Sequence, residues 1–420
     1  MNQDYDNVLQ PIPSEQRIEF LDILRGIAVL FIYAANIVFF SGYLSFPVEH
    51  NLSWTILPID QAFGFFNYTF IDGKFYSIFS LLFGIGCMVQ YQSSLAQNRS
   101  FAPFFRRRMF WLMILGFVHL CFLWLGDILT LYALLGFVLI WFVDYSDKKL
   151  LIWACLLLLL PIVNWTIIHY IGFDYPDIFR HGSANYWEYF GYPLSEWEGK
   201  KYPKTLFLMQ NESMVDFLIM NIGNSLMRVY QILDDGRVFK VLAIFLIGLV
   251  AGRHVLKNEL LQNTALLKKF ALWGMGIGLP FSFFRTYIDF FLIYTSDFWS
   301  FVSTVSYTLG TVPLALGYCC LFVLINHKRT HLFSHFGPVG RMAFTNYVSQ
   351  TILSILIFYG IGLKLGGKFG FTFVMAICMV IFLIQVQFSK WWLSKFHYGP
   401  LEWVWRSLTY GRKQPFKITF

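Results

Sequence analysis

The sequence has very little charge for its length. Only 13% of its 420 residues are Asp, Glu, Lys or Arg, whereas 57% are hydrophobic. A soluble globule of this size needs more polar surface than this composition supplies, which excludes an ordinary soluble enzyme or binding domain. The apolar residues therefore need lipid as their solvent.

Cysteine is scarce, and the common catalytic motifs are absent. At Gly73–Lys74 a phosphate-binding loop is excluded, because Tyr68 stands at the position of the first required glycine and Phe75 at that of Ser or Thr. No H-E-x-x-H or G-x-S-x-G pattern occurs. Since all six cysteines lie in apolar runs, we expect no disulfide framework and no metal site. They are Cys87, Cys121, Cys155, Cys319, Cys320 and Cys378.

What the sequence does contain is ten apolar runs. A membrane-crossing helix needs about 20 residues, and a helix is the only open-chain element that satisfies its own backbone in lipid. The first run lacks the basic start and small-residue exit of a cleavable signal, so we expect it to remain as a span. We predict an all-α polytopic membrane protein with about ten transmembrane helices, at about 21–41, 74–95, 105–125, 128–144, 149–171, 238–256, 267–287, 302–326, 343–363 and 369–391.

The positions of Lys and Arg predict the orientation in the membrane. Basic residues collect in five regions on one side of the predicted spans, whereas residues 42–73 contain neither Lys nor Arg. Because translocation of positive charge is disfavoured, the basic side should be cytoplasmic. We therefore expect a bacterial inner-membrane protein with both termini in the cytoplasm. The net charge of +8 then reflects topology and does not indicate a nucleic-acid partner.

The spans predict one integral membrane domain over residues 1–420. Residues 172–237 form an insertion on the outer side, and residues 392–420 form a cytoplasmic tail. Within the insertion, residues 214–232 show helical spacing; they could lie along the membrane surface, which we favour, or plug the outer mouth. Gly248 and Gly252 form one G-x-x-x-G pattern, which favours close helix packing over a homodimer interface.

Polar side chains inside the predicted spans mark candidate functional sites. At 100° per residue, Arg25 and Asn36 lie about 20° apart on the first helix, with Asp22 within about 60° of both. This spacing indicates a polar stripe along one helix face. The alternative is an ion pair between Asp22 and Arg25 at the membrane edge, with Asn36 bonded to a neighbouring helix.

Further candidates lie in later spans. His119 could act as a general base near neutral pH, or could hydrogen-bond a neighbouring helix. Asp127 lies at a short outer turn and could cap the helix that follows it. The segment GRMAFTNYVSQ places Arg341 and Asn346 at the cytoplasmic start of the ninth span. Two further charged residues, Lys74 and Glu402, are assigned to a substrate site or a structural polar core.

The chain resembles the YeiB-like bacterial membrane proteins, domain of unknown function 418, almost end to end. The resemblance rests on LDILRGIAVL with Asn36, and on GKFYSIFSLLFGIG, GFVHLCFLWLGDILTLYALLG, GPVGRMAFTNYVSQTILSILIFYGIG and GPLEWVWRSLTYG. The pattern D-x-x-R-G, followed by a polar residue eleven positions after the arginine, is also similar to the start of two groups of membrane acyltransferases. These are the acyltransferase-3 enzymes and the lysosomal heparan glucosaminide acetyltransferases.

This wider resemblance implies an acyltransferase that uses cytoplasmic acyl-CoA, such as acetyl-CoA, as its donor. In the lysosomal type, asparagine stands at the position of Asn36, and a functional histidine follows, before a tryptophan and an aspartate. Here His50, Trp54 and Asp60 occur at slightly different spacing. The resemblance thus implies Asn36 with His50 or His119 as catalytic residues.

The resemblance also implies a binding site for the donor and an acceptor on the opposite side. Arg25, Arg341 and Asp22 would bind the coenzyme, ahead of Arg106 and Arg107. The acceptor would be a hydroxyl or amine of a cell-envelope glycan or a small molecule, reached from the outside. Two alternatives stay open: a proton-coupled transporter or exporter that uses Asp22, Arg25, His119 and Asp127, and a membrane scaffold.

Overall fold

A computed structural model describes residues 18–43, 57–197, 199–204, 206–257, 259–292, 296–329 and 331–418. The described chain is helical apart from one antiparallel hairpin that pairs Leu194 with Pro203. Its first half contains α1 (Glu19–Phe40), α2 (Leu57–Phe70), α3 (Lys74–Ala96), α4 (Phe101–Phe122), α5 (Leu129–Leu139), α6 (Asp147–Trp165), the π-helical turn η4 (Thr166–Tyr170), α7 (Asp177–Tyr189), β1 (Leu194–Trp197) and β2 (Lys200–Pro203). Then follow α8 (Leu206–Gln210), α9 (Met214–Asp234), α10 (Arg237–Leu256), α11 (Glu259–Gln262), α12 (Thr264–Phe291), α13 (Asp297–Lys328), α14 (Phe336–Arg341), α15 (Ala343–Phe358), α16 (Phe371–Leu393) and α17 (Pro400–Tyr410).

Each of the ten predicted apolar runs falls on a helix of the structure: α1, α3, α4, α5, α6, α10, α12, α13, α15 and α16. Within the described ranges, six helical stretches are long and apolar enough to cross a membrane: Glu19–Phe40, Pro58–Ala96, Asp147–Tyr170, Arg237–Leu256, Asp297–Lys328 and Phe371–Leu393. The apolar helices α5 and α15 are shorter. The protein is therefore an all-α membrane protein, as its composition predicts.

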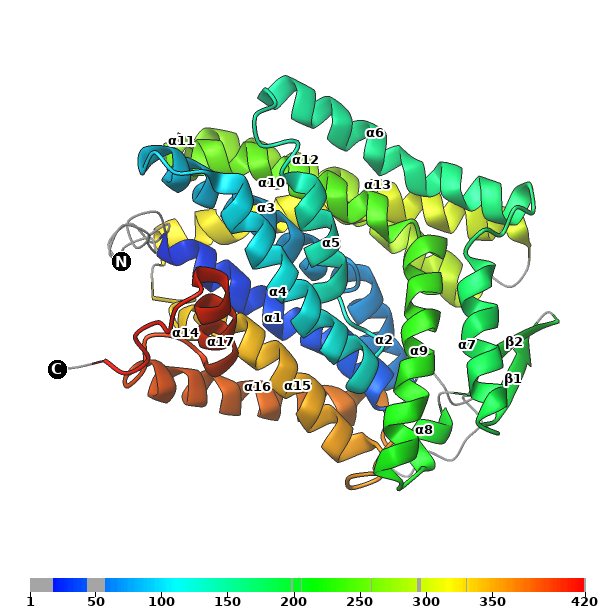
Figure 1. Cartoon of the computed structure of the whole chain (residues 1–420). Coiled ribbons are helices and arrows are strands. Elements are labelled where there is room, and N and C mark those ends of the chain that lie inside the picture. Colours follow the sequence, from blue (N-terminus) through cyan, green and yellow to red (C-terminus); the bar gives the residue numbers. More distant parts are fainter. Residues whose placement is uncertain are drawn as a thin grey trace.

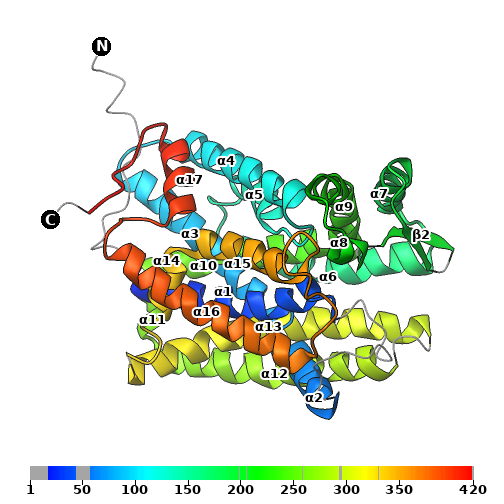
Figure 2. The ribbon, with the colours of Figure 1, turned by 90° about the horizontal axis from the view of Figure 1, so that it is seen from below.

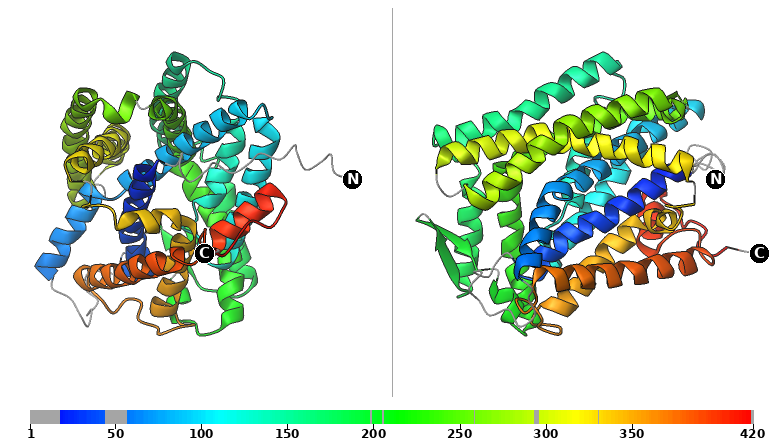
Figure 3. Two further views of the ribbon diagram at one scale, coloured as in Figure 1. Left: turned by 90° about the vertical axis from the view of Figure 1, so that its left-hand side faces the viewer. Right: turned by 180° about the vertical axis from the view of Figure 1, so that it is seen from behind.

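Helix α1 runs through the centre of the bundle. It packs against α3 and α13 on one side and against α14, α15 and α16 on the other, and Figure 3 shows it surrounded by these helices. The long helices α12 and α13 lie side by side along one flank (Figure 2). A hydrophobic core thus surrounds α1, which explains why a helix that carries Asp22, Arg25 and Asn36 is mostly buried.

The two ends of the bundle differ in what they carry. The start of α1, helix α14 and helix α17 lie at one end (Figure 1). We call it the basic end because these segments contain Arg25, Arg341 and Arg406. Helices α7, α8 and α9 and the β1–β2 hairpin, all from residues 172–237, lie at the opposite end, which we call the hairpin end.

Backbone contact between α1 and α14 organises the basic end. A Cβ atom on Gly340 would lie 1.8 Å from the carbonyl oxygen of Asp22, and one on Gly26 would lie 2.1 Å from that of Phe336. Only glycine lets two helix backbones approach so closely. Because Arg25 precedes Gly26 and Arg341 follows Gly340, this contact brings the two arginines to one place.

A similar contact confirms the close-packing interpretation of Gly248 and Gly252. A Cβ atom on Gly248 would lie 2.5 Å from the carbonyl oxygen of Leu81, and one on Gly252 would lie 2.8 Å from the Cβ of Met88. Both partners belong to α3 of the same chain. The G-x-x-x-G face is therefore occupied within the chain by the packing of α10 on α3.

The glycine contact predicts a position-specific loss of stability. Gly340→Ala should lower the midpoint of thermal unfolding of the detergent-purified protein, because overpacking costs about 1–3 kcal/mol. The matched control is Gly276→Ala in α12, where a Cβ would meet nothing within 4 Å. The control should keep or raise the midpoint, since alanine favours a helix more than glycine does. Equal midpoints for the two variants would contradict the contact.

Candidate functional site

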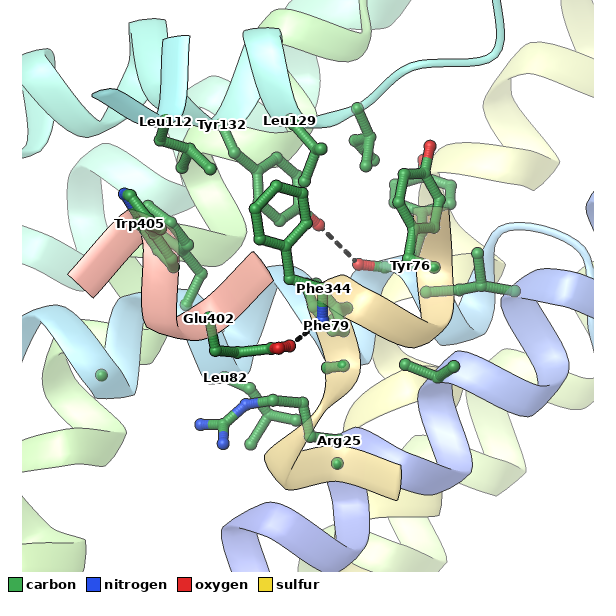
Figure 4. A pocket seen from close by; sticks show the side chains of 18 of the residues that line it. Arg25, Tyr76, Phe79, Leu82, Leu112, Leu129, Tyr132, Phe344, Glu402 and Trp405 are labelled. Atoms are coloured by element: carbon green, nitrogen blue, oxygen red, sulfur yellow. Dashed lines mark hydrogen bonds between the residues drawn. The ribbon is translucent and has the colours of Figure 1, made fainter. Parts of the chain in front are cut away.

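A cavity of about 350 Å³ lies beside α1, and its lining residues run from Arg25 and Arg341 at the basic end to Arg228 of α9. This volume falls in the range of small-molecule sites. Figure 4 shows labelled side chains from α1, α3, α4, α5, α15 and α17 around the cavity. Residues of α14 and single residues of α9 and α10 line it as well. Segments far apart in the sequence therefore build one site.

Four arginines surround the cavity at the basic end: Arg25, Arg108, Arg341 and Arg406. Arg25 donates from Nη1 to Oδ1 of Asp22 over 2.5 Å, so the ion pair that the sequence offered as an alternative is present. Arg341 donates from Nη2 to the carbonyl oxygen of His397 over 3.4 Å. The structure thus brings two of the predicted coenzyme-binding residues, Arg25 and Arg341, to the same cavity.

Aromatic rings hold the other two arginines in place. The Arg108 guanidinium lies 4.0 Å from the ring centroid of Trp405, and that of Arg406 lies 4.5 Å from the ring of Tyr398. A guanidinium over an aromatic face keeps its in-plane N–H donors for other partners. Arg106 and Arg107 are exposed and do not line the cavity.

The middle of the cavity is mainly apolar. Tyr132 is one of its few polar groups, and its hydroxyl bonds to Oγ of Ser80 over 2.6 Å and donates to the carbonyl oxygen of Tyr76 over 3.1 Å (Figure 4). The other side chains here are Phe79, Leu82, Phe83, Met109, Leu112 and Phe344. This section suits an uncharged chain.

Asn36 lies deeper along α1. Eleven residues of helix place it roughly 16 Å from Arg25, on the same face. It lines the cavity, and its side chain makes no hydrogen bond to another residue in the described part of the chain. Two residues of the expected polar stripe, Arg25 and Asn36, therefore line the cavity, and Asp22 is not among the lining residues.

Glu402 connects α17 to α15 at the cavity wall. Its carboxylate accepts hydrogen bonds from the backbone N–H groups of Phe344 and Thr345 over 2.7 and 3.0 Å, and from Oγ1 of Thr345 over 2.5 Å. Burial raises the pKa of Glu402, and the bonds from Thr345 oppose this shift. A carboxylate here satisfies the first free N–H groups of α15.

His119 and Asp127 lie together behind the cavity wall. Oδ1 of Asp127 accepts from the backbone N–H of Leu129 over 3.2 Å, and Oδ2 accepts from that of Thr130 over 2.8 Å, so Asp127 caps α5. His119 contacts Oδ1 of Asp127 through Nδ1 and Oγ1 of Thr351 through Nε2, both over 3.1 Å. His119 is not among the residues that line the cavity.

Arg228 lies at the end of the cavity that is nearest the hairpin end. It belongs to α9, which lies across this end, and it donates from Nε and Nη2 to the carbonyl oxygen of Asp127 over 3.2 and 3.1 Å. Arg228 also lines the cavity. Helix α9 therefore packs over the end of the cavity and contributes a side chain to it.

Asn346, the remaining candidate in α15, joins three helices. Its Nδ2 donates to the carbonyl oxygen of Val339 in the α14 segment over 3.2 Å and to Oγ of Ser389 in α16 over 3.0 Å. It is buried and is not among the cavity-lining residues. The structure thus places Asn346 in a polar contact between helices.

A second polar region, the buried charge cluster, adjoins the cavity near the hairpin end. Arg285 donates to Oδ2 of Asp72 over 2.8 Å and to Oδ2 of Asp289 over 3.1 Å, and Lys74 donates to the carbonyl oxygen of Tyr68 over 3.1 Å. Lys74 and Lys240 are its buried members, Asp235 is exposed and the rest are partly buried. The cluster consists of Tyr68, Asp72, Lys74, Tyr76, Asp235, Arg237, Lys240, Arg285, Asp289 and Tyr307.

Lys240 has the least favourable surroundings in this cluster. Its side chain is 3% exposed, and Nζ has no hydrogen-bond partner among the described residues. Nζ lies 3.3 Å from the ring centroid of Tyr307, and Cζ of Arg285 lies 4.1 Å from the same centroid. Two cations that share a ring within these distances repel each other by roughly 2 kcal/mol at an effective dielectric constant of about 20.

Sequence reasoning missed several of these residues. Lys240 and Arg285 fall within predicted spans, so their charge inside an apolar run was a usable signal. Arg108 was counted only among the basic residues that predict the cytoplasmic side, and it was not a candidate site residue. In the structure it lines the cavity. Asp60 accepts from the backbone N–H and Oγ1 of Thr372 and joins α2 to α16. Asp60 was predicted together with His50 and Trp54 from the resemblance to the lysosomal acetyltransferases. His50 and Trp54 lie outside the described residues.

Comparison with known proteins identifies the family. The chain is 31% identical to YxaH of Bacillus subtilis in an alignment of length 424, which covers 97% of this chain and 98% of that protein. It belongs to the YeiB-like DUF418 family. The model of this family, described as a protein of unknown function, matches residues 251–412.

Two further relatives cover nearly the whole chain. A 39.9 kDa protein from an amylase 3′ region of Bacillus acidopullulyticus is 30% identical over 97% of this chain and 98% of its own length. YeiB of Escherichia coli is 28% identical over 93% of this chain and 95% of its own length. No solved structure matches this chain.

The contacts of Glu402 predict that its removal destabilises the fold. Glu402→Ala should lower the free energy of unfolding by about 1–3 kcal/mol, because it leaves two backbone N–H groups of α15 without their acceptor. The control is Glu188→Ala, which removes an exposed ion pair with Lys201 and should change stability by less than about 1 kcal/mol. Denaturant unfolding in detergent, followed by circular dichroism, measures both. A loss no larger than that of the control would contradict this role for Glu402.

Proposed function

We propose that this DUF418 protein is a membrane acyltransferase. It moves a short, acetyl-like acyl group from cytoplasmic acyl-CoA to a hydroxyl or amine on the extracytoplasmic side. One observation carries the proposal: a single cavity is lined by Arg25 and Arg341 at the basic end, by Asn36 further along, and by Arg237 toward the hairpin end.

The proposal assigns ten membrane crossings to the ten apolar helices and places the basic end in the cytoplasm of a bacterial inner membrane. Support comes from the distribution of Lys and Arg, which is rich in the segments beside the basic end and poor over residues 42–73. Both chain ends then face the cytoplasm, and the β1–β2 hairpin faces outward.

The cavity offers what each part of an acyl-CoA requires. Its phosphates need bidentate cationic donors, and Arg25, Arg108, Arg341 and Arg406 supply them at the mouth. The pantetheine arm has no charge, which fits the apolar middle. A volume of about 350 Å³ accommodates this arm with a short acyl group, while the nucleotide remains at the mouth.

The reaction requires an attack on the thioester carbon. The acceptor oxygen or nitrogen forms the new bond to this carbon, the carbon–sulfur bond breaks, and the coenzyme leaves as a thiolate. The proton lost by the acceptor balances the charge on the thiolate, so the products are the acylated acceptor and free coenzyme. No oxidant or metal is needed.

Asn36 is the residue we assign to this step. Its side-chain amide can donate a hydrogen bond to the acyl oxygen as negative charge develops there. His50 and His119 remain the candidates for the proton transfer. In the structure, His119 is separated from the cavity by Tyr347, whose ring centroid lies 5.2 Å from that of the imidazole.

Proton-coupled transport is the second candidate function. The buried charge cluster favours it, because ionisable side chains within a membrane often belong to proton relays. A transporter would use the same cavity without breaking a covalent bond. The two functions differ in whether acyl-CoA binds.

Binding of acetyl-CoA tests the proposal directly. Isothermal titration of the detergent-purified protein should show micromolar affinity, and Arg25→Ala and Arg341→Ala should each weaken it roughly 10- to 100-fold, since a charge-assisted hydrogen bond contributes about 1.5–3 kcal/mol. Arg106→Ala is the matched control, because Arg106 lies in the same basic region but does not line the cavity. Absence of binding, together with proton-coupled uptake by proteoliposomes, would favour transport.

The role of Asn36 leads to a separate prediction. Asn36→Ala should slow acyl transfer by about 10²- to 10³-fold, because it removes a donor to the developing oxyanion. Affinity for acetyl-CoA and the unfolding midpoint should stay unchanged. The rate can be followed as release of free thiol from acetyl-CoA by proteoliposomes supplied with envelope extract. Wild-type rates in the variant would remove Asn36 from the mechanism.

A further inference from the structure

We propose that the buried charge cluster at Lys240 is a binding subsite for a group that carries one negative charge, a carboxylate or a phosphodiester. The assignment of this group to the acyl acceptor rests on the proposed acyltransferase function. The subsite itself rests on the charge balance, on the surroundings of Lys240 and on its position beside the cavity.

The formal charges of the cluster do not balance. Its four basic residues are Lys74, Arg237, Lys240 and Arg285, and its three carboxylates are Asp72, Asp235 and Asp289. Arg285 is paired with Asp72 and Asp289, and Arg237 donates to Asp235. With both lysines protonated, one positive charge is therefore left over, and a charge buried in a membrane protein needs a partner.

Lys240 is the residue that lacks a partner. Its side chain is almost fully buried, and Nζ makes no hydrogen bond within the described part of the chain. Its neighbours are the rings of Tyr307 and Tyr76, whose centroids lie 3.3 and 5.1 Å from Nζ. Ring faces attract a cation but do not accept the three N–H bonds of an ammonium group.

Further donors point to an anion. The hydroxyls of Tyr76 and Tyr307 lie 3.1 Å apart and hydrogen-bond each other, so one of the two keeps its hydrogen for another acceptor. Helix α10 begins at Arg237 without a side-chain cap, so the positive end of a 20-residue helix faces this region. Cations, hydroxyls and a helix start together form a typical oxyanion site.

The cluster is connected to the cavity through two of its members. Tyr76 and Arg237 both line the cavity, at the part nearest the hairpin end. In this proposal an acceptor bound in the cavity places its anionic group at Arg237, and its hydroxyl or amine extends toward Asn36. Lys240 is not among the cavity-lining residues, and its Nζ lies on the ring of Tyr76, which does line the cavity. The subsite would therefore select acceptors that carry one negative charge over neutral sugars.

Ligand-dependent thermal stability tests the subsite without acyl-CoA. The full-length protein in detergent is heated with sodium acetate or with sodium dimethyl phosphate, and with sodium chloride at equal ionic strength as the reference. At least one of the two anions should raise the unfolding midpoint above the chloride value, and its dissociation constant should be at least tenfold larger for Lys240→Met.

Two control variants separate this subsite from other basic groups. Lys364→Met removes an exposed lysine, paired with Glu212, in the loop between α15 and α16, and should respond to the anion like the wild type. Arg341→Ala reports on anions bound at the basic end: it should remove only the part of the response that comes from the mouth of the cavity, and the part that is lost in Lys240→Met should remain. Lys240→Gln repeats the test with a polar side chain, in case the methionine variant does not fold.

Each outcome bears on the proposal. Stabilisation by acetate alone assigns a carboxylate, and stabilisation by dimethyl phosphate alone assigns a phosphodiester. A wild type that responds to neither anion would overturn the subsite, and so would a full response in both Lys240 variants. Because acetyl-CoA is absent, failure here leaves the acyl-CoA titration unaffected, and failure of that titration leaves the anion site standing.

Discussion

The contact between Gly26 and Gly340 is the constraint on which the rest of the site depends. A Cβ on either glycine would collide with a carbonyl oxygen of the other helix, so α1 and α14 meet backbone to backbone. This contact fixes the depth of α1 in the bundle and brings Arg25 beside Arg341. The direction of α1 then carries Asn36 along the same cavity wall.

The free-energy cost of burying a charge explains how the charged side chains are distributed along the cavity. At the basic end, arginines keep part of their surface exposed or lie on aromatic rings, as Arg108 does on Trp405. Near the hairpin end, charges are buried and must be paired, as Arg285 is with Asp72. The cavity joins these two regions through an apolar middle section. A substrate that spans it would be charged at one or both ends and uncharged between them.

The sequence predicted the helices well, because apolar length is a local property. All ten runs are helical, and the stripe of Arg25 and Asn36 follows from helix geometry alone. The partners of these residues could not be predicted, since they depend on which helices touch. The contact of His119 with Thr351 joins residues 232 positions apart, and that of Arg228 with Asp127 joins residues 101 apart. The residue Lys240 could have been found as a charge within a span, but its missing partner is visible only in three dimensions.

Photolabelling tests most directly whether the cavity beside α1 holds an acyl-CoA. An acetyl-CoA analogue with a diazirine in its acyl group can be activated on the purified protein, and the modified peptides can be mapped by mass spectrometry. Labels should fall on α1 near Asn36 and on the facing residues Met109 and Tyr132, and excess acetyl-CoA should suppress them. Labelling that acetyl-CoA does not suppress, or that occurs only on the outer surface of the bundle, would contradict the account.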